Sequence, residues 1–94
     1  MLKQAQVDLL VELYLEHRLE EVISSAEILA AKNPKESIIF NILGLAEEGL
    51  RQFSASISHY KTAITIRPDY ADAHYNLGNV FHEVGDLDAA IASY

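Results

Sequence analysis

The C-terminal stretch 71–94 runs ADAHYNLGNVFHEVGDLDAAIASY. On both sides of Gly85-Asp86 its apolar residues recur at three- and four-residue intervals, a spacing that puts them on one face of an α-helix. Glycine often ends a helix, and aspartate often caps the helix that follows. The stretch therefore predicts a helix over about 71–84, a tight turn, and a second helix from 87 onward.

The same pattern returns when the chain is shifted by 34 residues. Both prolines then align, Pro34 on Pro68, and a fixed period of this length is typical of proteins built from one repeated structural unit. We expect one domain over 1–94, with repeats of about 3–36, 37–70 and 71–94, the last of them truncated. The other aligned sets are Leu9, Leu43 and Leu77; Leu19, Phe53 and Leu87; Ile23, Ile57 and Ile91; Gly44 and Gly78; and Tyr60 and Tyr94.

Each repeat is predicted to be a pair of helices. The join Asn33-Pro34-Lys35-Glu36 offers a capping side chain, a proline tolerated in a first turn and a glutamate three residues after the cap, so it is expected to start a helix. Asp69 with Asp72 repeats that arrangement, and Asp86 can cap the last helix. The predicted helices cover about 3–16, 19–32, 37–50, 53–66 and 71–84, with a sixth from 87 onward.

The segment 71–81, followed by 85–91 and Tyr94, resembles a tetratricopeptide repeat. The resemblance implies an all-α fold, in which antiparallel helix hairpins stack into a right-handed superhelix (a TPR-like solenoid) that binds peptides along its concave side. In the preceding unit the signature positions of the family are held by Phe40, Leu43, Gly44, Phe53, Ile57, Tyr60, Ala63 and Pro68.

Small residues are expected where the two helices of a hairpin cross. Gly44 faces Ser56, and Gly78 faces Ala90, so each pair of helices can approach closely. In the first unit Leu10 and Val22 take these places, which predicts a divergent and more open hairpin. Glu47 stands where the neighbouring units have Leu13 and Phe81, and the sequence offers no explanation for a charge there.

The charge balance argues against several classes of partner. Fourteen acidic and seven basic side chains leave a net charge of −7, which repels nucleic-acid phosphates and anionic lipid surfaces. No lysine or arginine follows Arg67. We expect no nucleic acid and no membrane as partner, and a protein or peptide partner of cationic character.

The location is expected to be cytoplasmic. The chain has no cysteine, which excludes disulfides and thiolate chemistry and fits a reducing compartment. Residues 1–10 lack the unbroken apolar core of a signal peptide, and 37–46, the most apolar stretch, is too short to span a bilayer.

No residue pattern predicts catalysis, a cofactor or a metal. His74 and His82 share a predicted helix but stand two turns apart, about 12 Å by helical rise, so they cannot ligate one ion together. Adjacent glutamates, as in Glu20-Glu21, point about 100° apart on a helix and share a proton poorly. The serines lack a neighbouring base and acid. The sequence therefore argues against an enzyme.

In the family that the chain resembles, one stripe of the first helix of each hairpin lines the concave groove. The first repeat contributes Gln4, Val7, Asp8 and Val11 to that stripe. The candidate peptide-binding residues of the other two repeats are Asn41, Ile42, Leu45, Glu48, Asp72, Tyr75, Asn76, Asn79 and His82.

Some members of the family clamp a terminal dicarboxylate with basic and amide side chains on this stripe. The corresponding positions here hold Val7, Val11, Ile42, Asp72 and Asn76, so the clamp is absent and a ligand of that kind is not expected.

An alternative function remains open. Asn76 and Asn79 are similar to the asparagines that line repeat arrays attached to sugar-transferring enzymes, and the chain as a whole resembles repeats at the front of large bacterial transferases. The alternative is thus an accessory or self-associating N-terminal segment of a larger protein, with its groove filled by its own chain. Self-association would use the truncated C-terminal edge, where Val80, Val84, Leu87, Ile91 and Tyr94 gather.

Overall fold

The computed structural model of the protein describes residues 1–85, and the helix expected from residue 87 and the pairing of Gly78 with Ala90 lie outside that range. Each helix ends within one residue of its predicted limits, so the periodicity of the sequence is confirmed. The helices are α1 (Gln4–Leu15), α2 (Leu19–Lys32), α3 (Ser37–Gly49), α4 (Phe53–Ile66) and α5 (Ala71–Glu83).

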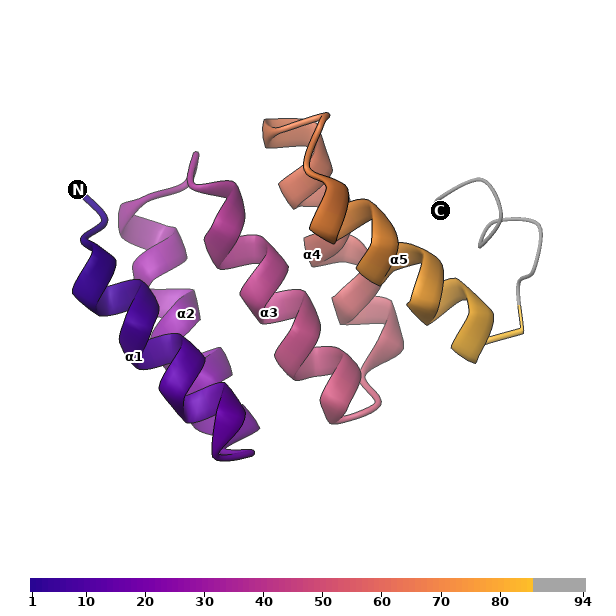
Figure 1. Ribbon diagram of the computed structural model, residues 1–94, viewed down its shortest axis with the longest axis horizontal. Coiled ribbons are helices and arrows are strands. Elements are labelled where there is room, and N and C mark those ends of the chain that lie inside the picture. Colours follow the sequence, from indigo (N-terminus) through magenta and orange to yellow (C-terminus); the bar gives the residue numbers. More distant parts are fainter. Residues whose placement is uncertain (86–94) are drawn as a thin grey trace.

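The helices form two layers. In Figure 1, α1, α3 and α5 lie side by side in front, and α2 and α4 lie behind them. Each helix runs antiparallel to the one before it, so α1, α3 and α5 point the same way and their C-termini meet at one end of the stack (Figure 1). The slab measures 37 × 26 × 17 Å. Because α3 packs against all four other helices, it is the centre of the structure.

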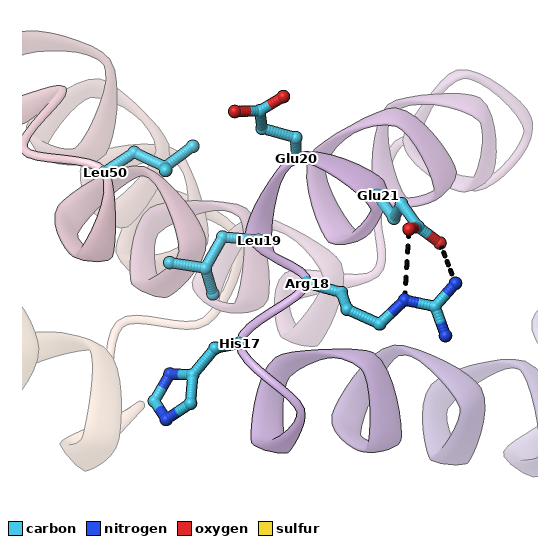
Figure 2. A pocket seen from close by; sticks show the side chains of 6 residues that line it. All are labelled: His17, Arg18, Leu19, Glu20, Glu21 and Leu50. Carbon is cyan, nitrogen blue, oxygen red and sulfur yellow. Dashed lines mark hydrogen bonds and ion pairs between the residues drawn. The ribbon is translucent and has the colours of Figure 1, made fainter.

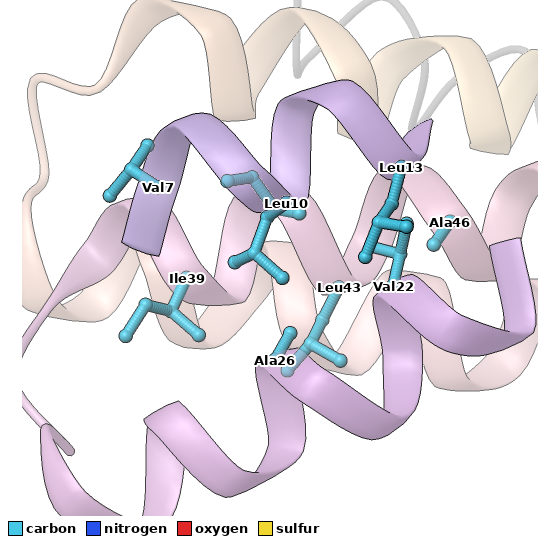
Figure 3. Close-up of a cluster of buried hydrophobic side chains, with 9 residues drawn as sticks. Val7, Leu10, Leu13, Val22, Ala26, Ile39, Leu43 and Ala46 are labelled. Atoms are coloured by element: carbon cyan, nitrogen blue, oxygen red, sulfur yellow. The ribbon is translucent and has the colours of Figure 1, made fainter. Parts of the chain in front are cut away.

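The main core lies between the first hairpin and α3. Figure 3 shows Leu10 of α1, Val22 of α2 and Leu43 of α3 pointing into one cluster. All three side chains are almost completely buried. Burying a side chain of this size stabilises a fold by roughly 1.5–3 kcal/mol, so helices of 12 to 14 residues gain much of their stability from this contact.

The two complete hairpins differ in which helix supplies the large residue, and which the small one, where the helices cross. In the second, the ring of Tyr60 on α4 lies against Gly44 on α3. In the first, one period earlier, the large residue Leu10 comes from α1 and the small residue Ala26 from α2, and both are buried. A volume-conserving exchange of this kind keeps a core filled. The helices α3 and α4 also approach more closely than α1 and α2, as expected for a more open first hairpin.

A polar contact accompanies the close approach of α3 and α4. Ser56 is fully buried, and its hydroxyl donates to the carbonyl oxygen of Gly44 at 2.8 Å. The expected pair Gly44 and Ser56 therefore does meet, and the hydrogen bond satisfies the buried hydroxyl of Ser56.

The expected capping at the joins between repeats was wrong. Helix α3 begins at Ser37, as predicted, but neither Asn33 nor Asp69 caps the helix that follows, since the N-cap residues are Glu36 and Tyr70. Asn33 instead ends α2, since its side-chain amide donates to the carbonyl of Leu29 at 3.0 Å. Each proline stands second in a four-residue turn closed by a backbone hydrogen bond, from Glu36 to Asn33 and from Tyr70 to Arg67. Proline favours this turn position because its φ angle is already close to the required value.

The joins within repeats share a left-handed residue at the 34-residue period. His17 and Arg51 have φ angles of 60° and 61°, and Gly85 has 84°. The next residue donates back across the helix end, from Arg18 to Leu13 and from Gln52 to Glu47, which is the Schellman pattern of helix termination. The turn geometry is therefore the same in the first two units although only the third has the glycine that it favours.

Gly44→Ala should destabilise the protein, because a methyl group there would lie 2.5 Å from a ring carbon of buried Tyr60. Overpacking of this kind costs about 1–3 kcal/mol, which thermal denaturation followed by circular dichroism would detect as a lower melting temperature. Gly49→Ala is the matched control, since its methyl group meets only the flexible tip of Leu19. Equal melting temperatures for the two variants would contradict the packing of Tyr60 on Gly44.

His17→Gly should stabilise the protein by about 1 kcal/mol, because glycine adopts the left-handed conformation without the clash of a β-carbon. His17→Ala keeps the β-carbon and should bring no such gain. Urea denaturation of the two variants and the parent chain would measure the difference in the free energy of unfolding. A glycine variant no more stable than the alanine variant would argue against the left-handed conformation at this residue.

Candidate functional site

The candidate residues lie on the outer surface of α1, α3 and α5, which we call the α1–α3–α5 face. They differ in how much of each side chain is available. Asn41 and Ile42 are buried, with 6 % and 7 % exposure, so they offer almost no surface to a ligand. Asp72, Tyr75 and His82 on α5 are exposed, and Leu45, Glu48, Asn76 and Asn79 are half-buried.

Two of the amides link neighbouring hairpins. The side-chain nitrogen of Asn76 donates to the side-chain oxygen of Asn41 at 3.1 Å, and the nitrogen of Asn41 lies 3.5 Å from the hydroxyl of Tyr70. The amide of Asn76, a candidate peptide-binding residue, thus partly serves to hold α5 against α3. Asn41 and Asn76 therefore contribute to the packing of the repeats.

A hollow of about 270 Å³ opens at the end of this face where α1, α3 and α5 terminate. It lies between the C-terminal ends of the three helices and the loop between α3 and α4. Two of its lining residues carry carboxylates, Glu48 and Glu83, and one carries a guanidinium, Arg51. The lining residues are Tyr14, Leu45, Glu48, Gly49, Arg51, Phe53 and Glu83.

Glu48 is the half-buried carboxyl group of the hollow. Partial burial raises its pKa above the usual value, and the nearby charge of Glu83 raises it further. The hydroxyl of Tyr60 donates to Oε1 of Glu48 at 2.8 Å and opposes that effect. Burial and the neighbouring Glu48 together raise the pKa of Tyr60 far above its usual value, so the phenol stays protonated as the donor.

Sequence reasoning found Leu45 and Glu48 of this hollow and missed its other residues. The period could have found one of them, because Tyr14 lies 34 residues before Glu48 and therefore at the same place on its helix. Arg51 and Phe53 belong to a loop and to the start of α4, outside the stripe. Their approach to the hollow depends on the turn after α3.

Glu47, which the sequence left unexplained, faces α4. Its carboxylate lies 2.6 Å from Nδ1 of His59, where an imidazole N–H can donate to it. The ring of His59 also stacks on Phe40, with centroids 6.1 Å apart. Glu47 is almost fully buried, so this partner satisfies a polar group inside the second hairpin.

The other histidines are dispersed. His74 donates from Nε2 to the carbonyl of Pro68 at 2.8 Å and so ties α5 to the preceding turn, whereas His17 and His82 are exposed. Within residues 1–85 no group of three histidine, aspartate or glutamate side chains is placed to hold a metal ion. No helix in the same range has the length and apolar character needed to cross a membrane.

A second hollow, of about 220 Å³, lies at the loop between α1 and α2 (Figure 2). Arg18 donates there to both carboxylate oxygens of Glu21, at 3.0 and 2.6 Å. This contact raises the pKa of the guanidinium, but both side chains are more than half exposed, and solvent weakens an ion pair of this kind. The pair stabilises the loop and leaves Arg18 occupied.

Comparisons with known proteins agree with this architecture. Residues 51–85 match the model of the TPR repeat. Over 90 residues the chain is 24 % identical to the probable UDP-N-acetylglucosamine–peptide N-acetylglucosaminyltransferase SEC of Arabidopsis thaliana, a match that covers 96 % of this chain and 9 % of the plant protein.

The fold is also similar to solved structures of MamA. The form described as MamA 41-end from Desulfovibrio magneticus RS-1 superposes with a TM-score of 0.89 at 21 % identity, covering 95 % of this chain and 50 % of that one. MamA AMB-1 gives 0.83 at 19 % identity, covering 94 % and 48 %. The chain thus spans about half the length of these structures and a small fraction of the plant transferase.

The matched repeat, the 34-residue recurrence of the turn geometry and the stacked hairpins lead to one conclusion. Residues 51–85 form a TPR repeat, and the helices of residues 1–85 have a TPR-like fold.

Proposed function

We propose that the chain is a protein-binding module whose α1–α3–α5 face accepts a segment of another protein. TPR domains generally act as protein-interaction modules. The observation that carries the proposal is the exposure of large side chains along this face. Tyr75 on α5 is 60 % exposed and Val11 on α1 is 42 % exposed. Exposure of such apolar surface to water is unfavourable, and a bound segment would cover it.

The chemistry of the face supports a polypeptide ligand of cationic character. Apolar side chains on α1 and α3 give way to phenol, amide and imidazole groups on α5, which can hydrogen-bond a peptide backbone. The net charge of −7 favours positive partners. On this proposal residues 1–94 act as one domain in the cytoplasm, without a cofactor and without catalysis of their own.

The second candidate function is that of an accessory segment in a larger protein, such as a transferase. The match to the plant transferase favours it, because this chain corresponds to 9 % of that protein. Sequencing of the genomic region around the coding sequence distinguishes the two. A reading frame that continues into a catalytic domain supports the accessory function, and a stop codon after Tyr94 supports a free-standing module.

Binding at the α1–α3–α5 face is tested with peptides that are selected from a random displayed library for binding to the parent chain. The double substitution of Val11→Ser and Tyr75→Ala should raise the dissociation constant of a selected peptide about tenfold, because it removes exposed contact area from both edges of the face. Isothermal titration calorimetry measures the constant. Thermal denaturation should show nearly unchanged stability, since both side chains are exposed.

Ile28→Ser is the matched control. Ile28 is also 60 % exposed, but it lies on α2 in the other layer, so its loss should change peptide affinity by less than about twofold. Equal losses of affinity for the control and the double variant would place binding elsewhere and contradict the proposed face.

A further inference from the structure

We infer that the hollow at the end of the α1–α3–α5 face binds one basic side chain, an arginine or a lysine, of the partner segment. The inference rests on the proposed function, and it adds the chemistry that selects the segment. The size of the hollow fits a single long side chain, because about 270 Å³ is below the roughly 300–1,000 Å³ of most small-molecule pockets.

The walls of the hollow suit a side chain that is apolar along its stem and charged at its tip. Leu45, Phe53 and Tyr14 supply apolar and aromatic surface, and Glu48 and Glu83 supply the carboxylates. Lysine and arginine side chains bury their methylene groups against such surfaces and keep the charged head among polar groups.

Electrostatics inside the hollow favours a cation. Glu83 lies close enough to Glu48 for its charge to disfavour ionisation of Glu48. The C-termini of α1, α3 and α5 also meet at this end, and each helix terminus carries partial negative charge. A bound cation would offset both effects, so ionisation of Glu48 and binding of the cation support each other.

The protein already holds one guanidinium at the rim in the manner that we infer for the ligand. Arg51 places its guanidinium carbon 5.0 Å from the ring centroid of Phe53 and a nitrogen 4.0 Å from Glu83. Its side chain is 73 % exposed, so it does not fill the hollow. Among residues 1–85 no lysine, arginine or histidine nitrogen forms an ion pair with Glu48, which accepts a hydrogen bond from the hydroxyl of Tyr60.

The test compares matched peptides. Peptides selected from the random library should carry arginine or lysine at one common position, and replacing that arginine by citrulline, its neutral isostere, should weaken binding to the parent chain by at least about tenfold. For the double variant Glu48→Gln, Glu83→Gln the same replacement should cost less than about twofold, since the glutamine amides keep the shape and lose the charge. Added salt should weaken the binding of the arginine peptide more than that of the citrulline peptide.

A control double variant, Glu20→Gln with Glu27→Gln, changes the net charge equally at exposed positions on α2, and it should keep the full penalty for citrulline. Circular dichroism confirms that both double variants fold. Peptide binding without a penalty for citrulline, or an equal penalty in all three proteins, would overturn the inference and leave the proposed function standing. Failure of the parent chain to bind any selected peptide would overturn the proposed function itself.

Discussion

The contact between the ring of Tyr60 and the backbone of Gly44 connects the fold of this protein to its candidate site. With no side chain at Gly44, the ring can pass between α3 and α4, and its hydroxyl emerges beside Glu48. The same approach lets Ser56 donate to the carbonyl of Gly44. A methyl group at this one position would therefore disturb the packing of the second hairpin and the hydrogen bond at the hollow together.

The first hairpin and the second hairpin bury similar volumes by different means. The first hairpin has Leu10 and Ala26 where the second has Gly44 and Tyr60. The large side chain therefore comes from the first helix in one hairpin and from the second helix in the other. An aliphatic leucine has no hydroxyl to deliver to the α1–α3–α5 face. The exchange preserves the fold, but the buried phenol that donates to Glu48 comes from the second hairpin.

Polar groups inside the stack serve mainly to join repeats. Asn41 and Asn76 hydrogen-bond across the boundary between α3 and α5, and Glu47 pairs with His59 between α3 and α4. A buried amide or carboxylate without a partner costs free energy, so these contacts also select one register of packing over others. The proposed binding surface then consists of the exposed aromatic and apolar side chains and the acidic hollow at one end.

The amino-acid sequence determined the helices, their limits and the 34-residue repeat, because these depend on the spacing of apolar residues along a single chain. It also proposed Leu45, Glu48 and Tyr75 as groove residues, and all three keep exposed surface in the structure. Only the tertiary structure decided that Asn41 and Asn76 bond to each other, that Asn33 ends a helix instead of starting one, and that Arg51 and Phe53 reach the hollow. The physical reason is distance. A hydrogen bond or a cavity wall requires atoms of two helices to lie within a few ångströms of each other. The packing of Tyr60 on Gly44 and the left-handed turn at Arg51 set these positions, and the periodicity of the sequence does not specify them.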